Sequence, residues 1–150
     1  MTASPLDDPR IQAGMRRQFA LFEQRQRQGA RRIGWKVGFG APPAKERLKI
    51  AMPLVGFLVD HAVLSDGAGV SLAGWMKPLA EPEIAIELAR DLSETASERE
   101  IAQAIASIGP AIELADIDGP NDDVESILAG DIFHRHVIFG PRAPVELPGE

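Results

Sequence analysis

The sequence lacks several residue types, and each absence removes a class of function. Its 150 residues include no cysteine, which excludes disulfides, a thiol nucleophile, cysteine-ligated zinc and iron–sulfur clusters. They include no tyrosine, and only 5% of them are aromatic. Polar chemistry in this chain therefore depends on carboxylates, lysine, arginine, histidine or serine.

Excess positive charge and long apolar runs are also missing. The formal net charge of -6 argues against sequence-independent binding to nucleic acid or to an anionic membrane. No apolar run approaches the roughly 20 residues that span a bilayer. The first ten residues lack the basic-then-apolar pattern of a signal peptide. We therefore expect a cytoplasmic protein that binds neither nucleic acid nor membrane.

The remaining composition is that of one globular domain. Hydrophobic residues make up 45% and charged residues 25%, an ordinary balance. A chain of this length buries roughly two-thirds of its unfolded surface, enough for a core. Twelve prolines and fourteen glycines argue against a helix bundle. We expect one domain over residues 1–150, with loose tails at 1–8 and 141–150.

Hydrophobic patterning predicts a few helices among many short strands, which is typical of an α+β fold. An N-terminal amphipathic helix is predicted to begin with Asp8 as its N-cap and Pro9 at its first position. Further helices are predicted at 41–50, 98–108 and 122–129. Strands are predicted at 33–39, 54–59, 62–64, 70–72, 77–88, 111–115 and 136–139.

Three carboxylates are candidate metal ligands. Glu81 and Glu83 are two apart on a predicted strand, so both lie on one face, with Cα atoms roughly 6–7 Å apart. Two charges this close repel each other unless they are well solvated or a cation lies between them. Glu113 lies in an apolar strand, where carboxylates are rarely buried unpaired. Converging carboxylates suit Mg²⁺ or Mn²⁺; the alternative is a solvated strand face with an unrelated acid.

For each of the other polar residues, the sequence allows two interpretations. Lys36 lies mid-strand between two glycines, where it either faces an anionic ligand or keeps its ammonium in water at the surface. Asp60 follows an apolar run and is either a turn cap or a site acid. His134 and His136 are expected to share one strand face as hydrogen-bond donors to an anionic ligand. A zinc pair is the alternative, but a third nitrogen ligand is missing nearby.

Four segments together carry a resemblance to a known family. They are Gly-Trp-Lys-Val-Gly at 34–38, Gly-Phe-Leu-Val-Asp at 56–60, Leu-Ala-Glu-Pro-Glu-Ile-Ala at 79–85 and Pro-Ala-Ile-Glu-Leu at 110–114. They resemble the motifs of the 2-keto-4-pentenoate hydratase/2-oxohepta-3-ene-1,7-dioate hydratase family, within the fumarylacetoacetate hydrolase superfamily. Order and spacing agree over about residues 30–140, and the two acidic motifs are the most specific.

The resemblance implies a fold, an activity and a cofactor. The fold is a mixed β-roll of the fumarylacetoacetate hydrolase C-terminal-domain type, of which this chain carries an incomplete, metal-ligand-bearing part. The activity is that of a hydratase, a hydro-lyase acting on small 2-oxo or 2-hydroxydienoic acids in aromatic-compound catabolism. The cofactor is Mg²⁺ or Mn²⁺, which binds the substrate's carboxylate and 2-oxygen.

The resemblance also assigns roles to residues. Glu81, Glu83 and Glu113 match the family's metal ligands, and Lys36 and Asp60 match residues that line the active site and transfer protons. The expected substrate contacts are Gly38, Phe39, His134 and His136.

Alternatives of two kinds remain open. A 4-oxalocrotonate-type decarboxylase or an acylpyruvate-type C–C hydrolase acts on similar small acids. The second kind of alternative is not an enzyme: it is a non-catalytic half-fold that pairs with a partner chain. Because an open β-roll exposes strand edges and an apolar face, we expect a homo-oligomer or a complementary chain rather than a self-sufficient monomer.

Overall fold

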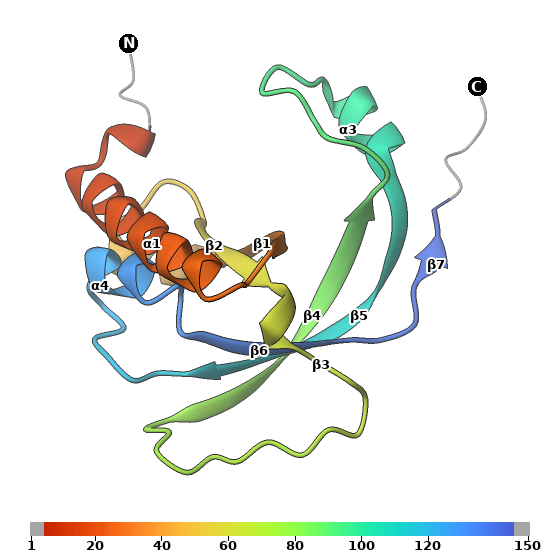
Figure 1. Cartoon of the computed structure of the whole chain (residues 1–150). Helices are drawn as coiled ribbons and strands as arrows, with labels where there is room; N and C mark the ends of the chain where they lie inside the picture. The colour runs from red at the N-terminus through yellow and green to blue at the C-terminus, as the bar shows by residue number, and fades with distance from the viewer. Residues whose placement is uncertain (1–4, 146–150) are drawn as a thin grey trace.

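A long N-terminal helix packs on a body of short helices and strands, and a two-stranded ribbon curves away from that body (Figure 1). The structure is a computed structural model that describes residues 5–145. Its helical elements are the single 3-10 turns η1 (Pro5–Asp7) and η2 (Asp60–Ala62), and the helices α1 (Pro9–Arg27), α2 (Pro42–Leu48), α3 (Glu98–Ala104) and α4 (Val124–Ala129). Its strands are β1 (Arg32–Gly38), β2 (Leu54–Val59), β3 (Val63–Leu64), β4 (Pro78–Leu88), β5 (Ile105–Asp116), β6 (His134–Phe139) and β7 (Ala143–Pro144).

The strands form two sheets. β1 and β2 pair antiparallel as a sheet of their own. The second sheet has the order β3-β6-β5-β4, with β7 added beside β5, and only β3 and β6 run parallel. The predicted combination of helices with a mixed sheet is therefore confirmed, whereas the β-roll stays a prediction.

The N-terminal helix begins where the sequence predicts. The Asp8 side chain accepts the backbone N–H of Arg10, and Pro9 occupies the first helical position. These two residues satisfy a free N–H group and preset the backbone for the first turn. The amphipathic helix predicted there is confirmed as α1.

α1 packs very closely on α4 and also reaches β2 through a side chain. A Cβ atom on Gly14 would lie 2.7 Å from the Cβ of Leu128, so only glycine allows this approach. The fully buried Gln18 donates from Nε2 to the backbone carbonyls of Leu128 in α4 and Val55 in β2. One glutamine thus ties the helix to both neighbours.

The main hydrophobic core lies where α1, α2 and α4 meet β2 and the turn before β6. Its buried members are Ile11, Leu48, Ile50, Leu54, Ala115, Val124, Ile127, Leu128, Ile132 and Phe133. This core fixes the position of the β6 turn against β1 and β5, the strands that carry candidate site residues.

The helix predicted at 98–108 and the strand predicted at 70–72 differ most from the structure. The helix predicted to end at 108 stops at Ala104, and Ile105 already begins β5. Ile105 and Ile108 pair with residues of β4, and this cross-strand packing suits β-branched side chains better than a helix. The strand predicted at 70–72 does not form; these residues are irregular.

Parts of both predicted tails are ordered into elements. η1 forms at residues 5–7, and β7 at residues 143–144 pairs with β5. The outer parts of the tails, 1–4 and 146–150, lie outside the described residues. Among the helices of residues 5–145, none combines the length and apolarity needed to cross a bilayer.

The β4–β5 ribbon has an acidic face and an apolar face. Side chains alternate along β4, so Ile84 and Ile86 point away from the face that carries Glu81 and Glu83. Ile84 is 71% exposed and Ile86 55% exposed, and Ile86 lies opposite Ile108 of β5. The ribbon therefore presents an uncovered apolar strip on its outer side.

Candidate active site

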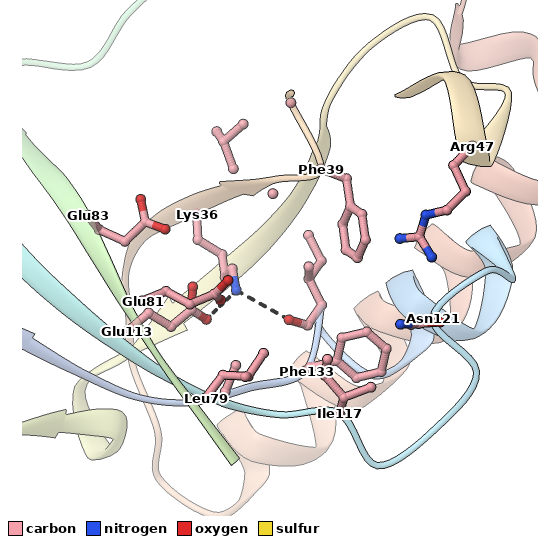
Figure 2. A pocket seen from close by; sticks show the side chains of 15 residues that line it. Lys36, Phe39, Arg47, Leu79, Glu81, Glu83, Glu113, Ile117, Asn121 and Phe133 are labelled. Atoms are coloured by element: carbon pink, nitrogen blue, oxygen red, sulfur yellow. Dashed lines mark hydrogen bonds and ion pairs between the residues drawn. The ribbon is translucent and has the colours of Figure 1, made fainter. Parts of the chain in front are cut away.

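A cavity of about 380 Å³ lies between β1 and the acidic face of the β4–β5 ribbon (Figure 2). Glu81 and Glu83 reach it from β4, and Glu113 reaches it from β5, directly opposite Glu81 in the strand register. Lys36 reaches it from β1 of the other sheet. The structure thus brings four predicted site residues, from three strands, to one cavity.

Lys36 is held inside this cavity. Its side chain is only 10% exposed, and its ammonium pairs with Oε1 of Glu113. It also donates to the backbone carbonyl of Ile132, 3.3 Å away. The alternative of a solvated surface lysine is therefore wrong.

Glu113 is the most enclosed of the three carboxylates. His134, which is fully buried, donates from Nδ1 to Oε1 of Glu113 at 2.8 Å. Within the described residues, both hydrogen bonds to Glu113 end on Oε1, so Oε2 receives no donor from the protein. Burial disfavours the charge of Glu113, but the His134 hydrogen bond and the Lys36 ammonium outweigh it and lower the pKa of the carboxyl.

The donor set fits a divalent cation, although the ligands do not converge. Burial and the negative charges of Glu113 and Glu81 raise the pKa of Glu83, because three carboxylates share a cavity in which the one nearby ammonium is already paired. Carboxylate oxygens are the donors that Mg²⁺ and Mn²⁺ prefer. Among residues 5–145, however, no three His, Asp or Glu side chains reach metal-ligand spacing. The metal role of these residues stays a prediction.

Gly38 and Phe39 line the cavity beside Lys36, at the end of β1. A Cβ on Gly38 would lie 3.0 Å from a methyl group of Ile132, so a side chain there would press on the cavity wall. Two of the four predicted substrate-contact residues therefore line the cavity, and the contact itself stays a prediction.

Asp60 is not brought to the cavity. It follows β2, accepts the backbone N–H groups of Arg31 and His61, and forms an ion pair with Arg31 at 3.0 Å. These bonds lower the pKa of the Asp60 carboxyl, the backbone hydrogen bond of Arg31 having the largest effect. Asp60 therefore caps a turn, as in the alternative interpretation. It does not lie beside Lys36.

The two histidines do not share a face as expected. His134 lies opposite Ala115 in the register and His136 opposite Leu114, so Arg135 forms a bulge that inserts an extra residue into β6. His134 therefore turns to Glu113, whereas the ring of His136 stacks on Trp75 with centroids 6.3 Å apart. Neither histidine lines the acidic cavity, and His134 touches it only through Glu113.

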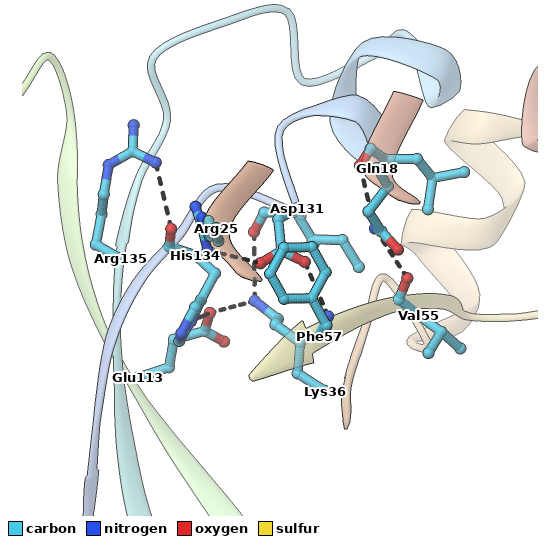
Figure 3. A network of polar contacts seen from close by, with 11 residues as sticks. Gln18, Arg25, Lys36, Val55, Phe57, Glu113, Asp131, His134 and Arg135 are labelled. Atoms are coloured by element: carbon cyan, nitrogen blue, oxygen red, sulfur yellow. Dashed lines mark hydrogen bonds and ion pairs between the residues drawn. The ribbon is translucent and has the colours of Figure 1, made fainter. Parts of the chain in front are cut away.

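Asp131 is a buried acid that sequence reasoning did not assign (Figure 3). Its Oδ1 accepts the backbone N–H of Phe57 at 2.9 Å, and its Oδ2 lies 3.6 Å from the Arg25 guanidinium. Burial raises the pKa of Asp131 to about 7, although the Phe57 N–H and Arg25 both oppose the rise. No local motif marks this aspartate, because its burial depends on α1 and β2.

Asp131 also opens a strained turn. The φ angles of Asp131, Ile132 and Phe133 are 56°, 54° and 63°, three consecutive values in the left-handed region that non-glycine residues seldom adopt. This turn directs the Ile132 carbonyl to Lys36 and places Ile132 and Phe133 on the cavity wall. Strain of this kind persists only where the surrounding structure enforces it, commonly at functional sites.

Two polar residues at the other end of the cavity were also missed. Arg47 from α2 and Asn121 from the loop after β5 line it. Figure 2 shows both on the far side of Phe39 and Phe133 from the three carboxylates. Both residues lie in polar segments without a motif, so only the tertiary structure reveals their position.

Comparison with known proteins identifies hydratases as relatives. No family model matches the chain. The chain is 37% identical to the 2-hydroxyhexa-2,4-dienoate hydratase of Comamonas testosteroni over 99 residues, which cover 64% of this chain and 38% of that enzyme. It is 33% identical to the 2-keto-4-pentenoate hydratase of Burkholderia vietnamiensis over 93 residues, which cover 61% of this chain and 36% of that enzyme.

A solved structure shares the fold. The 4-oxalocrotonate decarboxylase from Pseudomonas putida, complexed with magnesium and adipate, superposes with a TM-score of 0.78 at 23% identity. The match covers 85% of this chain and 50% of the decarboxylase, and the chain spans less than two-fifths of the length of the hydratases above. The resemblance inferred from the motifs is therefore confirmed: over about two-thirds of its length, the chain is similar to 2-keto-4-pentenoate-type hydratases.

Proposed function

We propose that the chain forms the metal-binding part of a divalent-metal-dependent hydratase of small 2-oxo or 2-hydroxydienoic acids, as used in aromatic-compound catabolism. The observation that carries this proposal is that Glu81, Glu83, Glu113 and Lys36 all line one cavity. The hydratase relatives and the magnesium in the related decarboxylase structure support it.

The three carboxylates would hold Mg²⁺ or Mn²⁺. When bound, the cation would supply a Lewis acid for the substrate's carboxylate and 2-oxygen. Mg²⁺ is our first choice, because the site offers carboxylate oxygens and room for water. Calcium and magnesium both occur in structures of the related decarboxylase, which supports a divalent cation in general.

Lys36 would hold a proton next to the reacting atoms. Its ammonium is enclosed and is fixed by Glu113 and the Ile132 carbonyl, so its position does not depend on solvent. A positioned general acid near a developing enolate accelerates tautomerisation by protonating carbon or oxygen as charge builds up. The apolar walls formed by Phe39 and Phe133 would exclude bulk water from the conjugated chain.

Partner chains form a further part of the proposal. The apolar strip on the outer side of the β4–β5 ribbon supports association with a second copy or with a complementary chain. Association would cover this strip while leaving the acidic face free for the small-molecule substrate.

Turnover of 2-hydroxy-2,4-pentadienoate by the purified chain tests the activity. We expect Mg²⁺-dependent loss of the diene absorbance, abolished by a chelator. Lys36→Met should lower turnover at least about 100-fold while Mn²⁺ affinity stays nearly constant, because a general acid contributes about 10²–10⁴-fold. Lys45→Met, which changes a charge on α2 outside the cavity, is the control.

The same assay separates the alternatives. Release of CO₂ from 4-oxalocrotonate without hydration would favour a decarboxylase. Metal binding without turnover of any 2-oxo acid would favour the non-catalytic half-fold. Turnover that survives both the chelator and Lys36→Met would overturn the proposed mechanism.

A further inference from the structure

The acidic cavity has a second cationic residue, and its charge is not paired with any of residues 5–145. Lys36 and Arg47 are the two cationic side chains that line it. Lys36 is paired with Glu113, whereas Arg47 forms no ion pair and no hydrogen bond with any of residues 5–145. A guanidinium with all its donors free is well suited to bind an anion from solution.

The location of Arg47 determines which part of a ligand it would meet. Figure 2 shows its guanidinium directed into the cavity from α2, on the side opposite to Glu81, Glu83 and Glu113. A ligand whose 2-oxo acid end lies at the carboxylates and Lys36 would extend its other end toward Arg47.

The wall between these two ends is apolar. The lining side chains there are Leu79, Phe39, Ile117, Ile132 and Phe133. Such a wall suits an unsaturated carbon chain and offers no partner for charge along its length. Polar side chains occur again only at the far end, where Arg47 and Asn121 both line the cavity.

We propose that Arg47, assisted by Asn121, is a distal anion subsite that selects 2-oxo acids with a second carboxylate at the end remote from the 2-oxo group. A guanidinium pairs with a carboxylate through two parallel N–H···O bonds, and an amide N–H supplies a third donor. A substrate that ends in a methyl group would leave these donors hydrogen-bonded to water and would gain no affinity from them. The inference rests on the proposed function, because it takes the carboxylate end of the cavity as the 2-oxo acid end.

Equilibrium binding tests this subsite independently of turnover. The probes are 2-oxoadipate and 2-oxohexanoate, six-carbon acids that differ only in a terminal carboxylate or methyl group, titrated in the presence of Mg²⁺ by calorimetry. We expect 2-oxoadipate to bind at least about 10-fold more tightly, because its terminal carboxylate would accept charge-assisted hydrogen bonds from Arg47. Arg47→Gln should remove this preference and leave 2-oxohexanoate binding unchanged.

Lys45→Gln is the matched control. It removes one positive charge from the same helix at a position outside the cavity lining, so the preference should persist in this variant. Arg47 is exposed at the surface, so its replacement leaves the core intact.

The outcomes separate this inference from the proposed function. Preferential binding of 2-oxoadipate that depends on Arg47, with no hydratase turnover, would support the subsite and contradict the hydratase. Equal affinity for both acids, binding of neither, or a preference that survives Arg47→Gln would overturn the subsite, whatever the activity. With an active chain, 2-hydroxyhexa-2,4-dienedioate should also be preferred over 2-hydroxyhexa-2,4-dienoate in kcat/KM.

Discussion

Within residues 5–145, Glu113 receives both of its hydrogen bonds on Oε1, and from this asymmetry we infer a positioning role for His134. The buried imidazole donates from Nδ1, and burial lowers the pKa of His134, which keeps the ring neutral. With Oε1 fixed in this way, Oε2 is the oxygen of Glu113 that stays available to a cation. Because His134 does not line the cavity, we propose that it acts through Glu113.

Replacing His134 tests this role. Asparagine keeps an N–H donor near the position of Nδ1, whereas leucine removes the donor at similar volume. We expect His134→Leu to weaken Mn²⁺ binding about 10- to 100-fold, the usual cost of losing a residue that orients a ligand, and His134→Asn to weaken it little. Electron paramagnetic resonance of free Mn²⁺ measures both. Equal weakening in the two variants, with equal thermal stability, would show a merely structural role.

Asp131 gives the folded chain a characteristic dependence on pH. Its pKa is raised from 3.8 to about 7 in the folded state, so between these values the folded chain holds a proton that the unfolded chain releases. The free energy of unfolding should therefore decrease as pH rises from about 4 to about 7, by up to roughly 4 kcal/mol from this group.

Asp131→Asn removes this contribution, because asparagine stays neutral and tolerates the left-handed backbone at this position. Urea unfolding at several pH values should show the wild-type chain losing stability relative to the variant as pH rises. Parallel stability curves for the two proteins would contradict the buried-acid account.

The predicted site residues that do reach the cavity are those whose side-chain direction depends on strand periodicity alone. Glu81 and Glu83 reach the cavity because a two-residue step returns to the same face of β4, and Glu113 follows from its apolar strand. Asp60 and His136 do not line the cavity, because a turn and a bulge decide their direction. Neither of these features has a distinct sequence signal here.

At the scale of elements, close packing of α1 on α4 holds the body together. The two helices meet at Gly14, where a methyl group would lie 2.7 Å from the Leu128 Cβ and 3.0 Å from the carbonyl oxygen of Glu125. The helix itself was predictable from its cap and its periodicity. The glycine contact was not, because it depends on a helix more than one hundred residues away in the chain.

Gly14→Ala should therefore destabilise the fold even though alanine favours helices. Overpacking of this kind costs about 1–3 kcal/mol, which exceeds the gain of up to about 1 kcal/mol in helix propensity. Gln24→Ala on the exposed side of α1 is the control and should change the free energy of unfolding little. A Gly14→Ala variant at least as stable as the wild type would refute this packing.

The boundary between α3 and β5 shows how tertiary pairing overrides local pattern. Isoleucines at 101, 105 and 108 fit one face of a helix, which is why a helix was predicted through this segment. In the structure, the last two pair with β4 and extend the ribbon. Local spacing alone does not separate these two outcomes, since the decisive partner is another strand.

At the scale of the whole molecule, the outer side of the β4–β5 ribbon is left uncovered by the rest of residues 5–145. Ile84, Ile86 and Ile108 are all 40% exposed or more, and they lie side by side across β4 and β5. A contiguous apolar strip of this kind marks an association surface.

We therefore expect self-association at micromolar concentration, measured by light scattering. Ile86→Lys should shift the chain toward monomer, because a charge on the strip would have to be desolvated on association. Glu87→Gln on the opposite face, which can still accept the hydrogen bond of Ser107, is the control. A wild-type chain that stays monomeric with full hydratase turnover would contradict this expectation.

The central claim is that Glu81, Glu83 and Glu113 form one divalent-cation site. Calorimetric titration of the wild-type chain with Mn²⁺ tests it most directly, alongside Glu83→Gln and a matched control, Glu87→Gln. Glu87 lies on the same face of β4 but pairs with Ser107 and Arg142, outside the cavity. The account predicts one bound ion per chain. Glu83→Gln should lower the Mn²⁺ affinity at least about 100-fold, which is more than the loss expected for a residue that only orients a ligand. Glu87→Gln should keep near wild-type affinity. No stoichiometric binding by the wild-type chain, or equal affinity in the two variants, would contradict it.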